Sequence, residues 1–219
     1  MKLSELPADF RRQIKERQRQ ERVHATAVVD ACKQGDAQRF FDLTFPYDGH
    51  PNFWPRAVSA IARTIPVVAP EIQEAFRRVW IETKMLSNGG DSRALCRALR
   101  VLMPGYKGEA LRLFRGANAL ERRRAAYGVS WTSNLTVAEQ FAEDYCGWSG
   151  GSVVLETLAS PEAIICAVEY PPPMTEAEKV ELGLSPDMKI IEYHQESEYL
   201  IDRRLLGPVK VLKRYRQAA

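Results

Sequence analysis

The C-terminal half of the sequence holds a short segment that ends an apolar run with an arginine, Leu113-Phe114-Arg115-Gly116. The planar guanidinium of such an arginine can hold a phosphate through two parallel hydrogen bonds. A surface ion pair is the alternative interpretation of Arg115, because such pairs are common and contribute little. This segment alone therefore indicates an anion site only weakly.

A second segment, Gly128 to Asn134, carries hydroxyl side chains at alternate positions. If the segment is a strand, Ser130 and Thr132 share one face, where they could hydrogen-bond a ribose or a neighbouring carboxylate. A helix is predicted over 136–145, with Thr136 as its N-cap and Glu139 completing a capping box. The alternative interpretation is an ordinary polar strand followed by a capped helix.

A third segment, Tyr193 to Ile201, contains two carboxylates that are two residues apart, Glu196 and Glu198. If the chain is extended here, both carboxylates project from the same face. Like charges so close are costly unless they have a compensating role. The alternative interpretation is the solvated edge of an exposed strand.

Taken together and in this order, the three segments resemble the R-S-E class of mono-ADP-ribosyltransferases. Arg115 matches the arginine of that family's L-x-R-G-like strand, and Ser130-Trp131-Thr132 matches the S-T-S segment, which precedes a V-A-E-x-F-A helix. Glu196-Ser197-Glu198 matches the E-x-E segment of members that modify arginine. The resemblance covers roughly residues 105–215 and leaves the N-terminal half unexplained.

Two departures from the family pattern are visible. Trp131 replaces the middle residue of S-T-S, and Thr132 replaces its last serine while keeping a hydroxyl. The second E-x-E register, with Glu196 as the catalytic glutamate, also fits the letters. We favour Glu198, because Tyr199-Leu200-Ile201 continues from it as a strand, as in the family.

The resemblance implies that NAD is the substrate that supplies ADP-ribose. Breaking its N-glycosidic bond builds positive charge on the ribose, as in glycoside hydrolysis, and a fixed carboxylate stabilises that charge. We expect Glu198 to take this role, with Arg115 on the pyrophosphate and Ser130 orienting Glu198 or contacting the ribose. The catalytic set is then Glu198, Glu196, Arg115 and Ser130.

The remaining NAD contacts are expected from residues around this set. Gly116, Trp131 and Thr132 belong to the matching segments, and Phe141 and Tyr145 lie on the following helix, where their rings could stack on nicotinamide. Core packing is the alternative for both rings, and we favour it for Phe141. Trp148 lies in a glycine-rich loop that could cover NAD.

The acceptor is expected to be a macromolecule, either a protein or a nucleic acid. By position, Tyr193 and Glu196 belong to the loop that recognises the acceptor in the family, and Glu196 could orient and deprotonate a guanidinium. No catalytic role is expected for His194. The resemblance also favours a bacterial or phage toxin or effector, in which the helical half could bind the target or a neutralising partner.

The elements that must position these residues fall into two halves, which predicts an α+β fold. Residues 1–104 are expected to form a helical region, with Ile72, Phe76, Val79 and Trp80 on one buried face. The prolines between residues 46 and 70 predict helices of short to medium length. Residues 105–219 are expected to form a mixed β-sheet core of ADP-ribosyltransferase type. Its predicted strands include residues 111–114, 152–155, 163–168, 189–191, 199–201 and 209–212.

Composition adds bounds to this interpretation. An apolar content of 45% in 219 residues predicts a globular core, and a net charge of +3 does not require a nucleic-acid partner. The four cysteines form no CxxC pair, so we expect no metal. The charged N-terminus has no apolar signal region and no segment is long enough to span a bilayer, so we expect a cytoplasmic protein without membrane contact. Export without a signal peptide stays open.

Other functions also fit the sequence. An NAD glycohydrolase would use the same site with water in place of the acceptor. A non-catalytic relative would bind a nucleotide or a partner without turnover. The basic N-terminal segment, from Arg11 to Arg22, could bind nucleic acid, although the interspersed Glu16 and Glu21 favour a solvated helix face.

Overall fold

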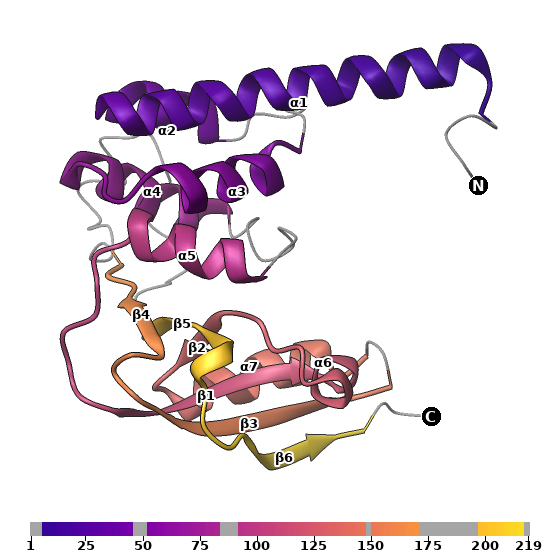
Figure 1. Ribbon diagram of the computed structural model, residues 1–219. Helices are drawn as coiled ribbons and strands as arrows, with labels where there is room; N and C mark the ends of the chain where they lie inside the picture. Colours follow the sequence, from indigo (N-terminus) through magenta and orange to yellow (C-terminus); the bar gives the residue numbers. More distant parts are fainter. Residues whose placement is uncertain (1–5, 46–51, 84–91, 148–149, 171–196, 217–219) are drawn as a thin grey trace, which may run out of the picture. The chain divides into compact units, whose positions relative to one another are not determined.

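The computed structural model describes residues 6–45, 52–83, 92–147, 150–170 and 197–216. The chain divides into two compact units, Met1–Pro104 and Gly105–Ala219. The division falls at Pro104-Gly105, where the sequence pattern changes from helical to strand-like. Figure 1 shows the helices of the first unit in indigo to magenta and the sheet of the second in pink to yellow.

The first unit is helical in all its described parts. Its helices are α1 (Ala8–Gln34), α2 (Ala37–Thr44), α3 (Trp54–Thr64), α4 (Pro70–Thr83) and α5 (Ser92–Leu102). Gly35 ends α1 in the left-handed region with φ 70°. Asp36 then caps α2, accepting a 3.0 Å hydrogen bond from the backbone N–H of Arg39.

The predicted helical stripes form the core of this unit. Ile72, Phe76 and Val79 are 0% exposed and Trp80 is 2% exposed, which confirms the predicted face of α4. In α5 the leucines at 95, 99 and 102 are buried in the same way. The aromatic rings of Phe76 and Trp54 meet edge to face at 6.2 Å, which links α4 to α3.

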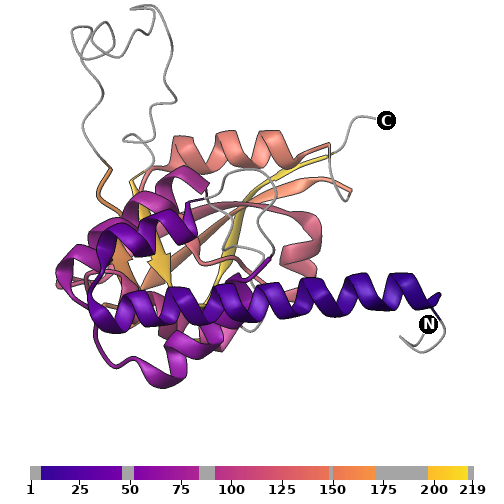
Figure 2. The same ribbon diagram turned by 90° about the horizontal axis from the view of Figure 1, so that it is seen from above.

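Helix α1 is longer than the predicted short to medium helices. It has 27 residues, because the prolines that limit helix length follow it in the chain and Pro7 directly precedes its first residue. Its buried residues begin only at Ala25. Figure 2 shows the preceding part of α1 extending beyond the other helices of this unit.

The second unit is built on one six-stranded sheet. Its strands are β1 (Leu111–Asn118), β2 (Ser130–Thr132), β3 (Ser152–Ala159), β4 (Ile164–Ala167), β5 (Glu198–Ile201) and β6 (Lys210–Tyr215), in the spatial order β4-β5-β2-β1-β3-β6. Helices α6 (Ala119–Arg124) and α7 (Leu135–Tyr145) interrupt the strands, and a 3-10 turn, η4, covers Arg203–Leu205. The α+β class is therefore confirmed.

The sheet is antiparallel, whereas a mixed sheet was predicted. Every pairing among the described strands is antiparallel. The reason is the position of β1, which lies between β2 and β3 and runs opposite to both. The helix α7 between β2 and β3 therefore does not produce a parallel neighbour pair. The predicted strand over 189–191 lies outside the described residues.

Different groups of residues pack on the two faces of this sheet. On one face Phe114 and Val154 pack against Ala138 and Ala142 of α7. The helix can approach because β1 carries Gly116, where a Cβ would lie 2.5 Å from the carbonyl oxygen of Ala138 and from the backbone nitrogen of Ala142. The other face holds a larger apolar cluster around Leu113, Ala117, Trp131, Val153, Leu155 and Ile201.

The N-cap of α7 differs from the predicted one. Asn134, not Thr136, caps the helix, and its side-chain oxygen accepts a 3.0 Å hydrogen bond from the backbone N–H of Thr136. Asparagine is as effective a cap as serine or threonine, so the helix begins at the earlier signal. Glu139 instead pairs with Lys213 of β6 at 3.1 Å.

Candidate functional site

The carboxylate of Glu198 lies at the start of β5 and is held by two hydroxyl groups. The Ser130 Oγ donates a hydrogen bond to its Oε1, and the Tyr170 hydroxyl donates one to its Oε2. Strand pairing explains the first contact, because Glu198 lies opposite Thr132, and Ser130 lies on the same face of β2 two residues earlier. The expected shared face of Ser130 and Thr132 is therefore present and points toward Glu198.

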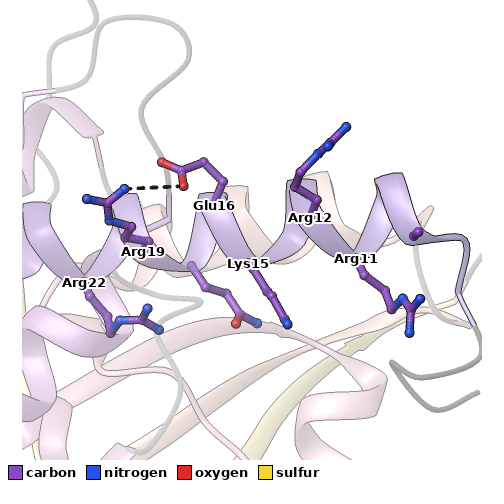
Figure 3. Close-up of a pocket in the computed structure, with 8 residues that line it drawn as sticks. Arg11, Arg12, Lys15, Glu16, Arg19 and Arg22 are labelled. Carbon is purple, nitrogen blue, oxygen red and sulfur yellow. Dashed lines mark ion pairs between the residues drawn. The ribbon is translucent and has the colours of Figure 1, made fainter.

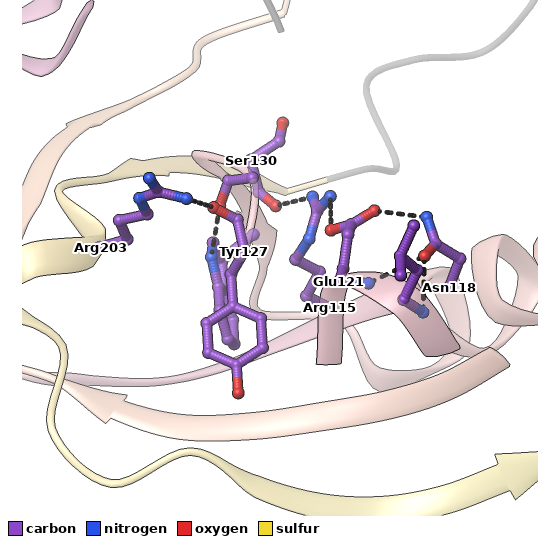
Figure 4. A network of polar contacts seen from close by, with 9 residues as sticks. Arg115, Asn118, Glu121, Tyr127, Ser130 and Arg203 are labelled. Atoms are coloured by element: carbon purple, nitrogen blue, oxygen red, sulfur yellow. Dashed lines mark hydrogen bonds and ion pairs between the residues drawn. The ribbon is translucent and has the colours of Figure 1, made fainter. Parts of the chain in front are cut away.

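Arg115 of β1 reaches the same group of residues from the other side of β2. Its Nη1 donates a 2.7 Å hydrogen bond to the carbonyl oxygen of Ser130, and its Nη2 donates a 2.9 Å bond to Glu121 of α6. Strands β1 and β2 pair at Phe114 and Thr132. The guanidinium therefore contacts Ser130 outside the paired part of the two strands. Figure 4 shows Arg115 between Ser130 and Glu121.

The turn before β2 holds the Arg115 guanidinium in place. A Cβ at Gly128 would lie 2.6 Å from Arg115 Nη2, so the guanidinium occupies space that only glycine leaves open. The turn itself is fixed by the Trp131 indole, which donates a 3.2 Å hydrogen bond to the Gly128 carbonyl oxygen. Arg203 donates a 3.4 Å bond to the Tyr127 carbonyl oxygen in the same turn (Figure 4).

Glu121 is in turn fixed by the residue that caps its helix. The Asn118 side-chain nitrogen donates a 2.9 Å hydrogen bond to Glu121 Oε1, and the Asn118 oxygen accepts from the backbone N–H groups of Leu120 and Glu121. A continuous polar chain therefore runs from Asn118 through Glu121, Arg115 and Ser130 to Glu198. Such networks orient their members because each group is held by two partners.

This chain is partly withdrawn from solvent. Glu198 is 4% exposed, and the side chains of Arg115 and Glu121 are 16% and 23% exposed. The Nε of Arg115 is buried and has no hydrogen-bond partner among the described residues. Buried unpaired donors are uncommon, and because this N–H is closed to solvent, an incoming acceptor reaches it only when the guanidinium moves.

The neighbouring thiol of Cys166 in β4 responds to this environment. Burial, and to a smaller extent the negative charge of Glu198, raise the pKa of Cys166 to about 12. Cys166 is 0% exposed and therefore remains a neutral thiol at physiological pH. This thiol is no nucleophile for the chemistry of the site.

The prediction that the carboxylates of Glu196 and Glu198 share one face assumed an extended chain. The chain is not extended at Ser197, which lies between them. Ser197 has φ 43°, in the left-handed region that non-glycine residues rarely adopt. The strand therefore begins at Glu198, and the alternation that would place Glu196 on the same face does not apply across Ser197. Glu196, Tyr193, His194 and Trp148 lie outside the described residues.

Two residues of the predicted NAD contacts have structural roles instead. Trp131 is 2% exposed and packs in the apolar cluster on the face opposite Ser130, because it lies between the two hydroxyl residues of β2. Gly116 faces α7, whose backbone fills the space beside its Cα. Neither offers a surface to NAD in this structure. Thr132 is 6% exposed, and its hydroxyl accepts a 2.9 Å hydrogen bond from the backbone N–H of Asn134.

The favoured core packing of Phe141 on α7 is not what the structure has. Phe141, for which core packing was favoured, is 37% exposed, and Tyr145 is partly buried. Their rings stack with centroids 6.4 Å apart and an interplanar angle of 26°. The Phe141 ring is therefore exposed rather than in the core, and it lies beside the partly buried Tyr145 ring on the helix that follows β2.

Three residues that hold the predicted set, Asn118, Glu121 and Tyr170, were not predicted from the sequence. Glu121 contacts Arg115 from six residues along the chain, in a helix of only six residues. Tyr170 contacts Glu198 from 28 residues away. The asparagine at 118, a typical N-cap followed by Glu121 three residues later, is the one local signal that could have indicated α6.

The basic part of α1 is partly neutralised within the helix. Asp9 pairs with Arg12 at 2.9 Å, and Glu16 pairs with Arg19 at 3.7 Å (Figure 3). Figure 3 also shows Arg11, Lys15 and Arg22 on the opposite side of the helix from Arg12 and Arg19. The ion pairs agree with the solvated-face interpretation for one side of this helix.

The described residues include no helix that combines the length and apolar character of a membrane span. They also include no group of three or more His, Cys, Asp or Glu side chains arranged to hold a metal ion. Comparisons of the chain with protein-family models, with curated proteins and with solved structures found no match.

Proposed function

We propose that the chain is a mono-ADP-ribosyltransferase that transfers ADP-ribose from NAD to a macromolecular acceptor. One observation carries this proposal. Arg115, Ser130 and Glu198 come from three different strands and form one hydrogen-bonded chain, through the Ser130 carbonyl oxygen and the Ser130 hydroxyl. The resemblance to the R-S-E class selects the same three residues. They are far apart in the sequence, so their contact is not a consequence of local chain geometry.

The chemistry of these residues suits the reaction. NAD would supply an ADP-ribosyl group whose N-glycosidic bond breaks with the electron pair leaving on nicotinamide, while the acceptor atom bonds to the ribose carbon and loses its proton. The carboxylate of Glu198 stabilises the positive charge that develops at the ribose, more strongly in a partly buried site than in water. Ser130 and Tyr170 fix the orientation of that carboxylate.

Arg115 has two parts in this proposal. Its hydrogen bond to the Ser130 carbonyl oxygen holds the residue that orients Glu198. Its guanidinium would donate to the pyrophosphate, and the buried Nε could take part once the side chain moves toward the ligand. Glu121 shares the guanidinium charge, so a bound pyrophosphate would compete with Glu121 for Arg115.

The acceptor side of the reaction rests on the family resemblance alone. Glu196 and Tyr193 are proposed to contact the acceptor, which would be a protein or a nucleic acid. A toxin or effector role, with a neutralising partner for the producing cell, belongs to the same proposal. The helical unit, Met1–Pro104, would then bind the target or that partner.

The test uses purified full-length protein, a whole-cell lysate, and NAD labelled either in its adenylate phosphate or in its nicotinamide. We expect adenylate label on a macromolecule together with free nicotinamide, and protease or nuclease digestion identifies the acceptor class. Glu198→Gln should lower the rate by about 10²- to 10³-fold. Glu156→Gln is the matched control, because it removes a carboxylate that pairs with Arg112 elsewhere on the same sheet.

The outcomes separate the competing functions. Nicotinamide release without labelled macromolecules indicates an NAD glycohydrolase. Wild-type protein that neither binds nor consumes NAD contradicts the proposal. Equal activity of Glu198→Gln and wild type contradicts the assignment of Glu198, and circular dichroism establishes that each variant is folded.

A further inference from the structure

The second unit contains an arginine-lined cavity outside the candidate site. It has a volume of about 230 Å³, and four arginines line it together with Ser152 and Tyr215: Arg122, Arg123, Arg214 and Arg216. It shares no lining residue with the chain of Arg115, Ser130 and Glu198. What this cavity binds is therefore a separate question from the proposed transfer of ADP-ribose.

The topology brings the four arginines together from two elements. Val153, which lines the cavity, is paired with Ala117 of β1 on one side and with Arg214 of β6 on the other. Arg214 therefore lies near the end of the edge strand β6, and Arg216 directly follows the strand. Helix α6 follows β1 directly and supplies Arg122 and Arg123 to the same cavity.

The lining of this cavity is basic. None of the described residues that line it is acidic, and Arg122, Arg214 and Arg216 form no ion pair in the described parts of the chain. Other arginines of the same unit do have carboxylate partners, such as Arg112 with Glu156 and Arg204 with Asp202. The four arginines are exposed, so solvent screens part of their mutual repulsion, and an anion held between them would lower it further.

We propose that this cavity binds a phosphate-bearing anion. A guanidinium group can donate two parallel hydrogen bonds to two oxygens of a phosphate. Guanidinium groups from two elements can contact the anion from two sides. The volume is below the ~300–1,000 Å³ of pockets that enclose drug-sized ligands. The size therefore suits one or two phosphate groups rather than a whole nucleotide.

The test is calorimetric titration of the full chain with pyrophosphate at low ionic strength. Wild type should bind it, and Arg122→Gln/Arg214→Gln should bind at least about 100-fold more weakly, at about tenfold for each charge-assisted contact. The matched control is Arg124→Gln/Lys210→Gln, which removes two exposed charges from α6 and β6 that do not line the cavity. Its affinity should equal that of wild type.

A second arm identifies the source of the phosphate. Single-stranded oligonucleotides with and without a 5′-phosphate are titrated into the same variants. Oligonucleotide binding that depends on Arg122 and Arg214 indicates a nucleic-acid phosphate. If only pyrophosphate binding depends on these two arginines, the ligand is a small phosphorylated molecule. Either result supports an anion site at the cavity.

Three results would overturn the proposal. Wild type could fail to bind pyrophosphate and both oligonucleotides. The two double variants could lose affinity equally, which would indicate general charge attraction. Binding could disappear in Arg115→Lys and persist in Arg122→Gln/Arg214→Gln, which would place the anion at the candidate NAD site instead. Circular dichroism checks that each variant is folded.

Discussion

The Ser130 hydroxyl donates a hydrogen bond to the Glu198 carboxylate, although Thr132 is the residue that lies opposite Glu198 in the strand register. The contact is therefore diagonal across the β2–β5 pair, a geometry that long side chains can bridge. The directly opposed Thr132 instead uses its hydroxyl at the start of the α7 cap, accepting from Asn134. The two hydroxyl residues of β2 thus have different tasks, one toward the site and one toward the helix.

Removing the Ser130 hydroxyl tests the first task. Ser130→Ala should lower kcat for NAD cleavage by about 10- to 100-fold, because a hydrogen bond to a charged group is lost and Glu198 is less well oriented. Thr132→Val is the control within the same strand, and it should mainly lower the melting temperature. Equal kinetic effects of the two substitutions would contradict the division of roles.

The position of Arg115 can be tested without touching its side chain. In Gly128→Ala the new Cβ needs the space of Arg115 Nη2, 2.6 Å away, and the flexible guanidinium should move. We expect kcat/KM to fall by about 10- to 100-fold, as for other small displacements of groups near a reaction. Gly147→Ala is the control, because a Cβ there meets no described atom within 4 Å. Unchanged kcat/KM in Gly128→Ala would show that the placement of Arg115 is unimportant.

The packing role of Gly116 gives a prediction about stability. In Gly116→Ala the added methyl group lies 2.5 Å from backbone atoms of α7, which cannot move as a side chain does. We expect a loss of about 1–3 kcal/mol in the free energy of unfolding, typical of overpacking. Gly105→Ala, where a Cβ meets no described atom within 4 Å, should change it little. Urea unfolding measures both, and unchanged stability of Gly116→Ala would contradict the packing role of Gly116.

Sequence patterns predicted the parts of the fold that depend on local periodicity. The buried face of α4 and the strands around Leu113, Val153 and Leu200 follow from apolar spacing and β-propensity. The polarity of the sheet did not follow, because the order of strands depends on pairings between distant segments. The length of α1 was also not predicted. The prolines between residues 46 and 70 indicated short to medium helices, but α1 precedes them and contains no proline.

The candidate site shows the same division. Arg115, Ser130 and Glu198 were selected by type and order, but Glu121 and Tyr170 were not, since their contacts depend on how α6 and the segment after β4 return to the sheet. Trp131 was assigned to NAD because it stands inside the matching segment, whereas strand alternation turns its ring into the core. The bend at Ser197 had no sequence signal, because its left-handed φ belongs to a residue type that seldom adopts it.

The cysteines should differ sharply in reactivity. Burial raises the pKa values of Cys32 and Cys166 to about 12, so at pH 8 only about one molecule in 10⁴ carries either thiolate. Cys146 is partly exposed, and its thiol donates a 3.0 Å hydrogen bond to the Arg216 carbonyl oxygen. A maleimide added to the native protein should modify Cys146 first, as peptide mass mapping would show. Rapid modification of Cys166 before unfolding would contradict its burial beside Glu198.

The same two thiols make stability depend on alkaline pH. In the unfolded chain a thiol loses its proton near its ordinary pKa of 9.0, whereas in the folded chain Cys32 and Cys166 keep theirs up to about 12. Between these pH values the folded state binds more protons than the unfolded state, so stability falls as pH rises. The limiting slope is about 1.4 kcal/mol per pH unit for each thiol.

This slope can be isolated by substitution, since tyrosines and lysines also titrate in alkali. Urea unfolding of wild type and of Cys166→Ala is compared at pH 8 and pH 10, with Cys32→Ala as the matching variant of the helical unit. Each alanine variant should lose less stability than wild type between the two pH values, even though it starts less stable because of its cavity. Parallel losses in wild type and Cys166→Ala would mean that the thiol beside Glu198 ionises in the folded protein as readily as in the unfolded chain.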